Sequence, residues 1–354
     1  MKGLILCAGK GTRMRPLTYA VPKMLIPVAN KPVIYYAIES MKEAGIKEIG
    51  FVVSENRREL EPVLGNGKKW GMKFSYITQD KQNGIAHAVL CAEDYIDGED
   101  FVLYLGDNLV EEGVKGLVDI FVNGKANAAI SVTPVPEPQH FGVAVVKNGK
   151  IESLVEKPKK PKSNLAVCGI YVFDKNVFKA AKSIEPSARG ELEITDTISK
   201  LITTGRKVLP HVLEGWWRDT GQKADMIEAN QAVMEGIKTD IRGRVDESSR
   251  IEGRVVLEKG SIIKNSIVRG PAVIGEKSKI SNSYIGPYSS IGDEVDIQGS
   301  EVENSIVMSG TTIKNVGRRI ESSLIGNNAV LSGGSTKPKS LSVVLGDLCR
   351  LEID

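Results

Sequence analysis

The chain has 354 residues, of which 41% are hydrophobic, and its formal net charge is +3. This length predicts two domains or one large one, with enough apolar residues for a sizeable core. A charge so close to balance gives no reason to expect nucleic acid or a membrane surface as a partner.

The sequence also carries no sign of export. We expect no signal peptide, since strand-like sequence starts at Lys2, and no apolar run approaches the length of a membrane span. The four cysteines are widely scattered and lack the spacing of a metal site. We therefore expect reduced thiols in a cytoplasmic protein.

The first part of the chain alternates predicted strands with predicted helices. The short apolar runs lie at residues 4–7, 49–53, 74–78 and 101–105. The helical patterns between them cover residues 32–44, 57–64 and 84–92. This rhythm predicts right-handed βαβ units and a mostly parallel sheet.

Later strands come closer together, which indicates an antiparallel extension of the sheet. They are predicted at residues 128–133, 142–146, 151–155 and 167–173. Helical patterns return at residues 193–203 and 225–235.

The first strand leads into a loop rich in glycine and cations, here called the cation loop (residues 9–23). Its glycines and cations are Gly9, Lys10, Gly11, Arg13, Arg15 and Lys23. Glycines let backbone N–H groups approach a ligand, and clustered cations repel each other unless an anion lies among them. A Walker A run is absent, and Met14 stands where a dinucleotide fingerprint needs glycine. The loop predicts a different polyphosphate site, with a solvated basic turn as the alternative.

After Thr239 the pattern changes to an apolar residue at every fifth or sixth position. These residues are Ile251, Leu257, Ile263, Val268, Ile274, Ile280, Ile285, Ile291, Ile297, Val302, Val307 and Ile313. Hexapeptide spacing is typical of a parallel β-helix, whereas a sandwich would show strict alternation. We predict a domain at 1–239, a β-helix at 240–334, and a tail at 335–354 that packs on or caps the β-helix.

The run Gly9-x-Gly11-Thr12-Arg13-x-Arg15-Pro16-Leu17-Thr18, followed by Pro22-Lys23, resembles the opening of the sugar-1-phosphate nucleotidyltransferases. The resemblance extends over nearly the whole chain and is to the long thymidylyltransferase form of that family. It implies a Rossmann-like α/β domain with a mixed sheet, followed by a left-handed parallel β-helix.

The activity that the resemblance implies is Mg²⁺-dependent transfer of a nucleotidyl group from dTTP to glucose 1-phosphate, giving dTDP-glucose and pyrophosphate. UTP and N-acetylglucosamine 1-phosphate remain alternative substrates. The β-helix suggests a homo-oligomer, with a trimer as the simplest form.

Several candidate residues would bind the nucleotide. By resemblance these are Leu6, Ala8, Gly9, Gly11, Thr12, Arg13, Gln79, Gly84 and Asp107. Arg13 and Lys23 would neutralise the triphosphate and the departing pyrophosphate, so both are candidate catalytic residues. Gln79 could pair with a pyrimidine, while Gly84 would leave room for the base to stack; the alternative for Gln79 is an exposed amide at a strand end.

Two carboxylates are candidate Mg²⁺ ligands. Asp107 follows a buried strand, where α/β folds place ligands, although Asp-Asn is also common in turns. Asp219 lies in Trp216-Trp217-Arg218-Asp219-Thr220-Gly221, which resembles the family's late Trp-x-Asp-Thr-Gly element. Its alternative role is to cap the following helix. The pairing of the two carboxylates rests on the resemblance.

The sugar 1-phosphate is expected to bind Gly142, Glu156, Lys157 and Val167, again by resemblance. Lys157, in the family's Glu-Lys-Pro element, would hold the phosphate in line as a third candidate catalytic residue. Glu156 would accept hydrogen bonds from sugar hydroxyls. The alternative for Lys157 is a solvated lysine-rich loop. The block Arg189–Asp196 matches another family element, and Arg189 or Glu191 is expected to reach the sugar side.

Two other functions compete with this interpretation. One is a bifunctional enzyme whose β-helix also transfers acyl groups; hexapeptide acyltransferases generally use a histidine base, and no histidine follows His211. The other is a silent regulatory homologue, a class that tends to lose the loop cations or the metal acids. Arg13, Lys23, Asp107 and Asp219 are all present, which favours an enzyme.

Overall fold

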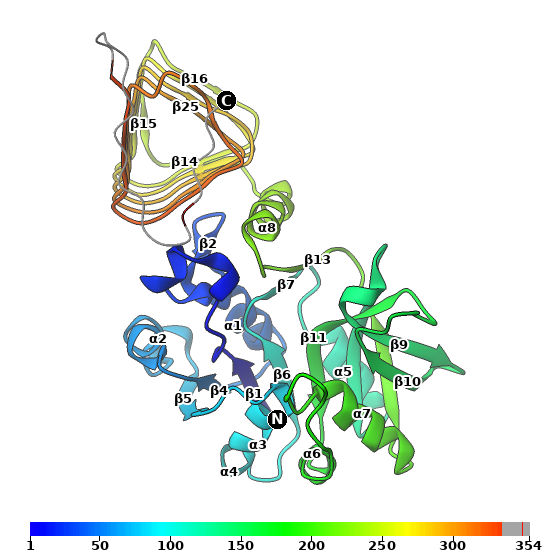
Figure 1. Cartoon of the computed structure of the whole chain (residues 1–354). Helices are drawn as coiled ribbons and strands as arrows, with labels where there is room; N and C mark the ends of the chain where they lie inside the picture. Colours follow the sequence, from blue (N-terminus) through cyan, green and yellow to red (C-terminus); the bar gives the residue numbers. More distant parts are fainter. Residues whose placement is uncertain (335–348, 350–354) are drawn as a thin grey trace. The chain divides into compact units, whose positions relative to one another are not determined.

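The computed structural model describes residues 1–334 and residue 349 (Figure 1). They form two compact units. The first unit comprises Met1–Lys10, Pro22–Met24 and Val33–Asp219, and the second comprises Gly11–Val21, Leu25–Pro32 and the described residues from Thr220 onward. The predicted tail at 335–354 lies outside the described residues, apart from Cys349.

The first unit is built on a mixed sheet whose parallel half comes from the N-terminal strands. β1 (Lys2–Leu6) lies between β4 (Glu48–Val53) and β6 (Phe101–Leu105) and is parallel to both, while β5 (Lys73–Thr78) is parallel to β4. The carboxyl ends of these strands therefore meet at one edge of the sheet, which is where open α/β sheets bind ligands.

The other half of the sheet is largely antiparallel. Its strands are β8 (Ala128–Pro134), β9 (Gly142–Lys147), β10 (Lys150–Glu156), β11 (Leu165–Phe173) and β12 (Val208–Val212). β11 joins the halves by pairing antiparallel with β6, β8 and β9. The long path through the sheet runs β10-β9-β11-β6-β1-β4-β5. The predicted fold class is confirmed.

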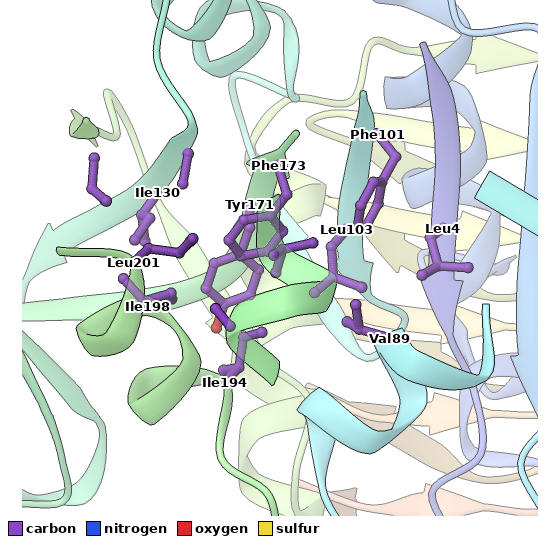
Figure 2. Packing of buried hydrophobic residues seen from close by; sticks show 14 of the residues in the cluster. Leu4, Val89, Phe101, Leu103, Ile130, Tyr171, Phe173, Ile194, Ile198 and Leu201 are labelled. Atoms are coloured by element: carbon purple, nitrogen blue, oxygen red, sulfur yellow. The ribbon is translucent and has the colours of Figure 1, made fainter. Parts of the chain in front are cut away.

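Seven helices of the first unit connect or cover these strands. They are α1 (Val33–Glu43), α2 (Arg57–Leu64), α3 (Ile85–Cys91), α4 (Glu93–Ile96), α5 (Lys115–Asn123), α6 (Asn176–Ala181) and α7 (Ile194–Thr203). Figure 2 shows Ile194, Ile198 and Leu201 of α7 on the side that faces Ile130 and Tyr171 of the sheet. This i, i+4, i+7 spacing buries one helix stripe, and truncating such a residue to alanine costs about 2–5 kcal/mol.

A two-stranded ribbon was absent from the sequence prediction. β7 (Asn108–Val110) directly follows the ligand-binding end of β6. It pairs antiparallel with β13 (Trp217–Asp219), more than a hundred residues later in the chain. The helices α4, α5 and α6 and the strand β12 were not predicted either.

The second unit contains a coil of short parallel strands arranged in three sheets, visible as a three-sided outline in Figure 1. The sheets run β14-β17-β20-β23-β26-β29, β15-β18-β21-β24-β27-β30 and β16-β19-β22-β25-β28. These strands have two or three residues each, from β14 (Asp240–Ile241) to β30 (Val330–Ser332). The arrangement is that of a β-helix, as the hexapeptide spacing predicts.

The interior of the β-helix is the aliphatic series found in the sequence. Eleven of its twelve members are buried in one cluster, and Ile251 packs against that cluster. Buried serines add a polar ladder: Ser283 N–H donates to Ser266 Oγ at 3.1 Å, and Ser300 N–H donates to Ser283 Oγ at 3.2 Å. Each step spans 17 residues, one coil of the helix.

The second unit also contains α8 (Lys223–Glu235) and a hairpin formed by β2 (Pro27–Val28) and β3 (Lys31–Pro32). Arg13 lies in a 3₁₀ turn, Thr12–Met14, of the same unit. Across residues 1–334 we find no helix with both the length and the apolar character that crossing a membrane requires.

Candidate functional site

The end of β1, just after Leu6, is held by side chains from two neighbouring loops. Asn56 Nδ2 donates to the Cys7 carbonyl at 2.6 Å, and Ser54 Oγ donates to the Ala8 carbonyl at 3.0 Å. Gln82 Nε2 also donates to the Ala8 carbonyl. At the next residue, exposed Gly9, an added Cβ would meet no atom within 4 Å. The chain thus presents a fixed backbone with open space at Gly9, which suits approach by a ligand.

Gly11, Thr12 and Arg13 belong to the second unit. Gly11 has φ 59°, in the left-handed region that favours glycine, and its carbonyl accepts from Thr18 Oγ1 at 2.7 Å. Thr12 and Arg13 are exposed. The Arg13 guanidinium lies against Gly221, where an added Cβ would be 3.3 Å from both Nη atoms. Glycine at position 11 therefore permits the left-handed backbone of the loop, and glycine at position 221 leaves room for the guanidinium of Arg13.

Lys23 is the buried cation of the loop, with 6% of its side chain exposed. Its Nζ donates to Asp107 Oδ2 at 2.7 Å, and Asn108 Nδ2 donates to Asp107 Oδ1 at 3.0 Å. A buried ammonium needs such a partner, because desolvating an unpaired charge is costly. The pair places an ammonium and a carboxylate together at the ligand-binding end of β6.

The β7–β13 ribbon brings the two predicted metal ligands into proximity. Asp219 is the cross-strand partner of Asn108, the residue after Asp107. Trp217 Nε1 donates to Asn108 Oδ1 at 2.7 Å and ties the ribbon together. The N-cap of α8 is Gln222, which forms a capping box with Asp225, so Asp219 does not cap this helix.

This donor set fits Mg²⁺, which binds proteins through one or two carboxylates and completes its shell with phosphate oxygens and water. Within residues 1–334 no cluster of three or more histidine, cysteine, aspartate or glutamate side chains offers a metal site supplied by protein alone. A metal held by Asp107 and Asp219 would accordingly need ligands from the substrate.

Gln79 follows β5 and is 4% exposed, so it is not an exposed strand-end amide. Its Nε2 lies 3.3 Å from the Gly84 carbonyl and 3.0 Å from His87 Nδ1, both acceptors for its two hydrogens. This arrangement fixes the orientation of the Gln79 amide through its Nε2. Sequence reasoning missed the part played by His87, although its place one helical turn after Gly84 is a usable signal.

Position 84 requires glycine because the backbone of Leu192 occupies the space that a Cβ would fill, so that space is not open to a ligand. Its φ is 101°, and an added Cβ would lie 2.5 Å from the Leu192 carbonyl oxygen. Ala86 N–H donates to that carbonyl at 3.1 Å, and Leu192 N–H donates to the Asn83 carbonyl at 2.8 Å. The block around Leu192 is therefore fastened to the loop that carries Gln79.

Three of the predicted sugar-binding residues converge at the start of β9. An added Cβ at Gly142 would lie 3.3 Å from Glu156 Oε2 and 3.6 Å from Val167 Cγ2. It would lie 3.0 Å from Thr195 Cγ2, a residue that the prediction did not include. The family-like block Arg189–Asp196 was the signal that could have identified Thr195. Glycine at 142 keeps this surface clear of a side chain.

Lys157 follows β10 in a strained conformation. Its φ is 42°, in the left-handed region that costs non-glycine residues roughly 1–3 kcal/mol. Its N–H donates to the Phe141 carbonyl at 3.0 Å, while its side chain is exposed. A strained backbone of this kind persists only where the surrounding structure holds it in place. Strained residues are common at ligand sites.

Arg189 connects the carboxylates of this region. Its Nη2 lies 2.8 Å from Glu193 Oε1 and 3.5 Å from Glu156 Oε1. Burial, and secondarily the charge of Glu193, raises the pKa of Glu156 above its usual value, against the opposing charges of Arg189 and Lys157. Glu156 therefore lies in a setting that penalises its charged form.

Comparisons with known proteins agree with this geometry. A family model described as nucleotidyl transferase matches residues 2–236. A glucose-1-phosphate thymidylyltransferase from Streptomyces griseus is 44% identical over 354 residues, covering all of this chain and 99% of its own. The low-salt glycan biosynthesis nucleotidyltransferase Agl11 from Haloferax volcanii is 45% identical over the whole of both chains.

Solved structures are also similar to about two thirds of this chain. A Bacillus anthracis crystal structure, provisionally described as a glucose-1-phosphate thymidylyltransferase in complex with sucrose, has a TM-score of 0.63 and 38% identity. It covers 68% of this chain and 98% of its own. A UDP-glucose pyrophosphorylase complexed with UDP-glucose has a TM-score of 0.60 at 28% identity, covering 66% and 98%.

Proposed function

Because this chain belongs to the nucleotidyl transferase family, we propose that it transfers the nucleotidyl group of dTTP to glucose 1-phosphate, forming dTDP-glucose and releasing pyrophosphate. The ion pair of Lys23 with Asp107, with Asp219 beside it on the ribbon, is the observation that carries the proposal. The full-length relative from Streptomyces griseus supports the choice of base and sugar through its name.

In the proposed reaction, a phosphate oxygen of the sugar 1-phosphate attacks the α-phosphorus of dTTP. The new bond joins that oxygen to the α-phosphorus, and the bond from the α-phosphorus to the bridging oxygen of pyrophosphate breaks. The nucleophile is already an anion near neutral pH, so no general base is needed. The protein's task is therefore to position two anions and to offset their charge.

The chain's own residues divide this task. Lys23 would offset charge on the triphosphate, Arg13 would do so for the departing pyrophosphate, and exposed Lys157 would align the sugar phosphate. When Mg²⁺ is bound through Asp107 and Asp219, it would supply Lewis-acid stabilisation of the phosphate oxygens.

Substrate identity is recognised on the remaining surfaces. Gln79 Oε1 would accept the N3–H of thymine, with His87 holding the amide in that orientation. Glu156, Val167 and Gly142 would line the sugar, and Thr195 would share that surface. Leu6, Ala8, Gly9, Gly11 and Thr12 would contribute backbone to the nucleotide site.

A matrix of nucleoside triphosphates against sugar 1-phosphates, read by pyrophosphate release, tests the proposal. We expect dTTP with glucose 1-phosphate to give the highest kcat/KM. A preference for UTP, or for N-acetylglucosamine 1-phosphate, would replace the proposed substrates. Inactivity with every pair, together with retained nucleotide-sugar binding, would instead identify a regulatory homologue.

An acyltransferase activity of the β-helix is the second candidate to test. A bifunctional protein GlmU from Methanocaldococcus jannaschii is 38% identical over 74% of this chain, which spans 61% of that protein. The lack of any histidine after His211 argues against acyl transfer here. An acetyl-CoA assay should give no transfer. We also propose that the protein is cytoplasmic and forms a homo-oligomer, a trimer in its simplest form. Light scattering would test the oligomeric state.

A further inference from the structure

A buried asparagine of α8 joins three segments of the second unit. Asn230 is fully buried, and its Oδ1 accepts from Ala29 N–H at 2.8 Å and from Ser290 Oγ at 2.7 Å. Its Nδ2 donates to the Tyr288 carbonyl at 2.9 Å and lies 3.7 Å from Met234 Sδ. A fully bonded buried amide specifies one geometry, because losing any partner would leave a desolvated polar group.

One of these segments is the hairpin turn that comes shortly after Lys23. Ala29 and Asn30 have φ of 47° and 61°, so this two-residue turn lies in the left-handed region, which alanine disfavours. Besides the bond from Ala29 to Asn230, Asn30 Nδ2 donates to the Ile291 carbonyl at 2.5 Å. The turn holds its strained shape through these two bonds, one to α8 and one to the β-helix.

The remaining contacts extend the same attachment. Leu17, in the cation loop, packs against the β-helix where a Cβ at Gly326 would be 2.9 Å from Leu17 Cδ2. Gln231 Nε2 donates to Asn304 Oδ1 at 2.7 Å, and Arg254 pairs with Glu235 at 2.7 Å, so α8 is fixed to two different coils of the β-helix. The segments before and after Pro22–Met24 thus both belong to the unit that contains the β-helix.

We propose that α8 and the β-helix position residues 11–21 of the cation loop for polyphosphate, and that Asn230 is the positioning residue. The inference rests on the proposed function in one respect, that this loop binds the polyphosphate of the nucleotide. It gives the β-helix a part in the nucleotidyl-transfer reaction itself, separate from any assembly or acyl transfer. Asn230 touches no substrate and acts through the turn at Ala29 and the loop that precedes it.

The test compares Asn230→Ala with Ser283→Ala in the full-length protein. Ser283 is also buried, and its side chain accepts from Ser300 N–H and donates to the Ser281 carbonyl, both within the β-helix, so its variant controls for a general loss of β-helix stability. Inorganic tripolyphosphate binding is measured by calorimetry, with Arg13→Ala as the reference for a lost loop contact.

We expect Asn230→Ala to weaken tripolyphosphate binding about tenfold, as loss of one well-aimed charged hydrogen bond would. Turnover should fall by up to about 100-fold, the effect of an ångström-scale misplacement. KM for the sugar 1-phosphate should stay within about twofold, and Ser283→Ala should match the wild type in all three measurements. Equal behaviour of the two variants, or equal rises in both KM values, would overturn the proposal.

A rescue experiment separates positioning from simple destabilisation. Ala29→Gly lets the turn adopt positive φ without strain, so it should restore part of the tripolyphosphate affinity in the Asn230→Ala background. No recovery would overturn the role assigned to the turn. If Asn230→Ala does not fold, Ser290→Ala removes one bond to Asn230 and is expected to show the same pattern in weaker form.

The outcomes also distinguish this proposal from the proposed reaction. A wild type that binds tripolyphosphate but does not use dTTP would contradict the substrate assignment and leave the Asn230 test intact. A wild type that uses dTTP but shows no loss on Asn230→Ala would contradict only the positioning role. Absence of tripolyphosphate binding in the wild type would overturn the positioning proposal.

Discussion

Lys23 and Asp107 form a buried ion pair of 2.7 Å at the ligand-binding end of β6, although they lie 84 residues apart in the chain. The side chain of Lys23 is almost fully enclosed, whereas that of Asp107 is 26% exposed. The pair therefore keeps the ammonium at the site and leaves part of the carboxylate accessible to a ligand. Both structural stability and activity should depend on it.

Replacing Lys23 should separate these two roles. Lys23→Met keeps the length of the side chain but leaves Asp107 without this ammonium, and we expect a loss of about 1–3 kcal/mol in urea unfolding. Turnover should fall at least about 100-fold, because charge on the phosphates loses its partner. The double variant Lys23→Met/Asp107→Asn should recover stability but not turnover. Near-normal turnover of Lys23→Met would remove this lysine from the mechanism.

Asp219 and Asp225 offer a matched pair for the metal prediction. Asp219→Asn weakens a predicted ligand, so the Mg²⁺ concentration for half-maximal rate should rise about tenfold or more. Asp225→Asn alters the capping box of α8, which is worth about 1 kcal/mol of stability, and should leave the Mg²⁺ requirement unchanged. A Mg²⁺ titration of the initial rate checks both. An unchanged requirement in Asp219→Asn, or full activity in EDTA, would contradict the assignment.

The raised pKa of Glu156 predicts how stability depends on pH. The folded state holds the proton of Glu156 more tightly than the unfolded state, whose pKa is near the usual 4.5. Ionised Glu156 therefore destabilises the folded protein fully above its raised pKa, and this penalty disappears as the pH falls through that pKa to below about 4.5.

Glu156→Gln removes the penalty. Relative to the wild type, the variant should gain stability at neutral pH, and the gain should vanish at acidic pH in urea unfolding followed from pH 4 to pH 8. Its KM for the sugar 1-phosphate should rise, since an amide accepts hydrogen bonds less strongly than a carboxylate. A stability difference that does not change with pH would show that burial does not perturb this carboxyl group.

Gly142 and Thr195 test the surface assigned to the sugar. In Gly142→Ala the new Cβ would be 3.0 Å from Thr195 Cγ2 and 3.3 Å from Glu156 Oε2, so neighbouring side chains must shift. We expect KM for the sugar 1-phosphate to rise about tenfold with little change in KM for dTTP. Thr195→Ser deletes the crowded methyl group and should partly restore the sugar KM in the double variant. Steady-state kinetics with each substrate varied in turn would show whether the effect is confined to the sugar.

Local sequence patterns were sufficient for most elements that lie on a repeating period. Residues 101–105 form the predicted strand, residues 57–64 form the predicted helix, and the hexapeptide aliphatics form the core of the β-helix. These predictions succeed because each element buries side chains at a fixed spacing along the chain, once per helical turn, strand face or side of a coil. Such spacing is visible among residues that are close in sequence. The cation loop was likewise recognisable from glycines and cations that are close in sequence.

The amino-acid sequence by itself determined the fold class, the β-helix and the residue types of a polyphosphate loop. Only the tertiary structure placed Asp219 opposite Asn108, the residue after Asp107. The strands β7 and β13 have three residues each, too few to show a period, and their pairing spans more than a hundred residues. The same holds for His87 behind Gln79, Thr195 beside Gly142, and Asn230 beneath the Ala29 turn. Such contacts arise from how distant elements pack, and no local spacing encodes them.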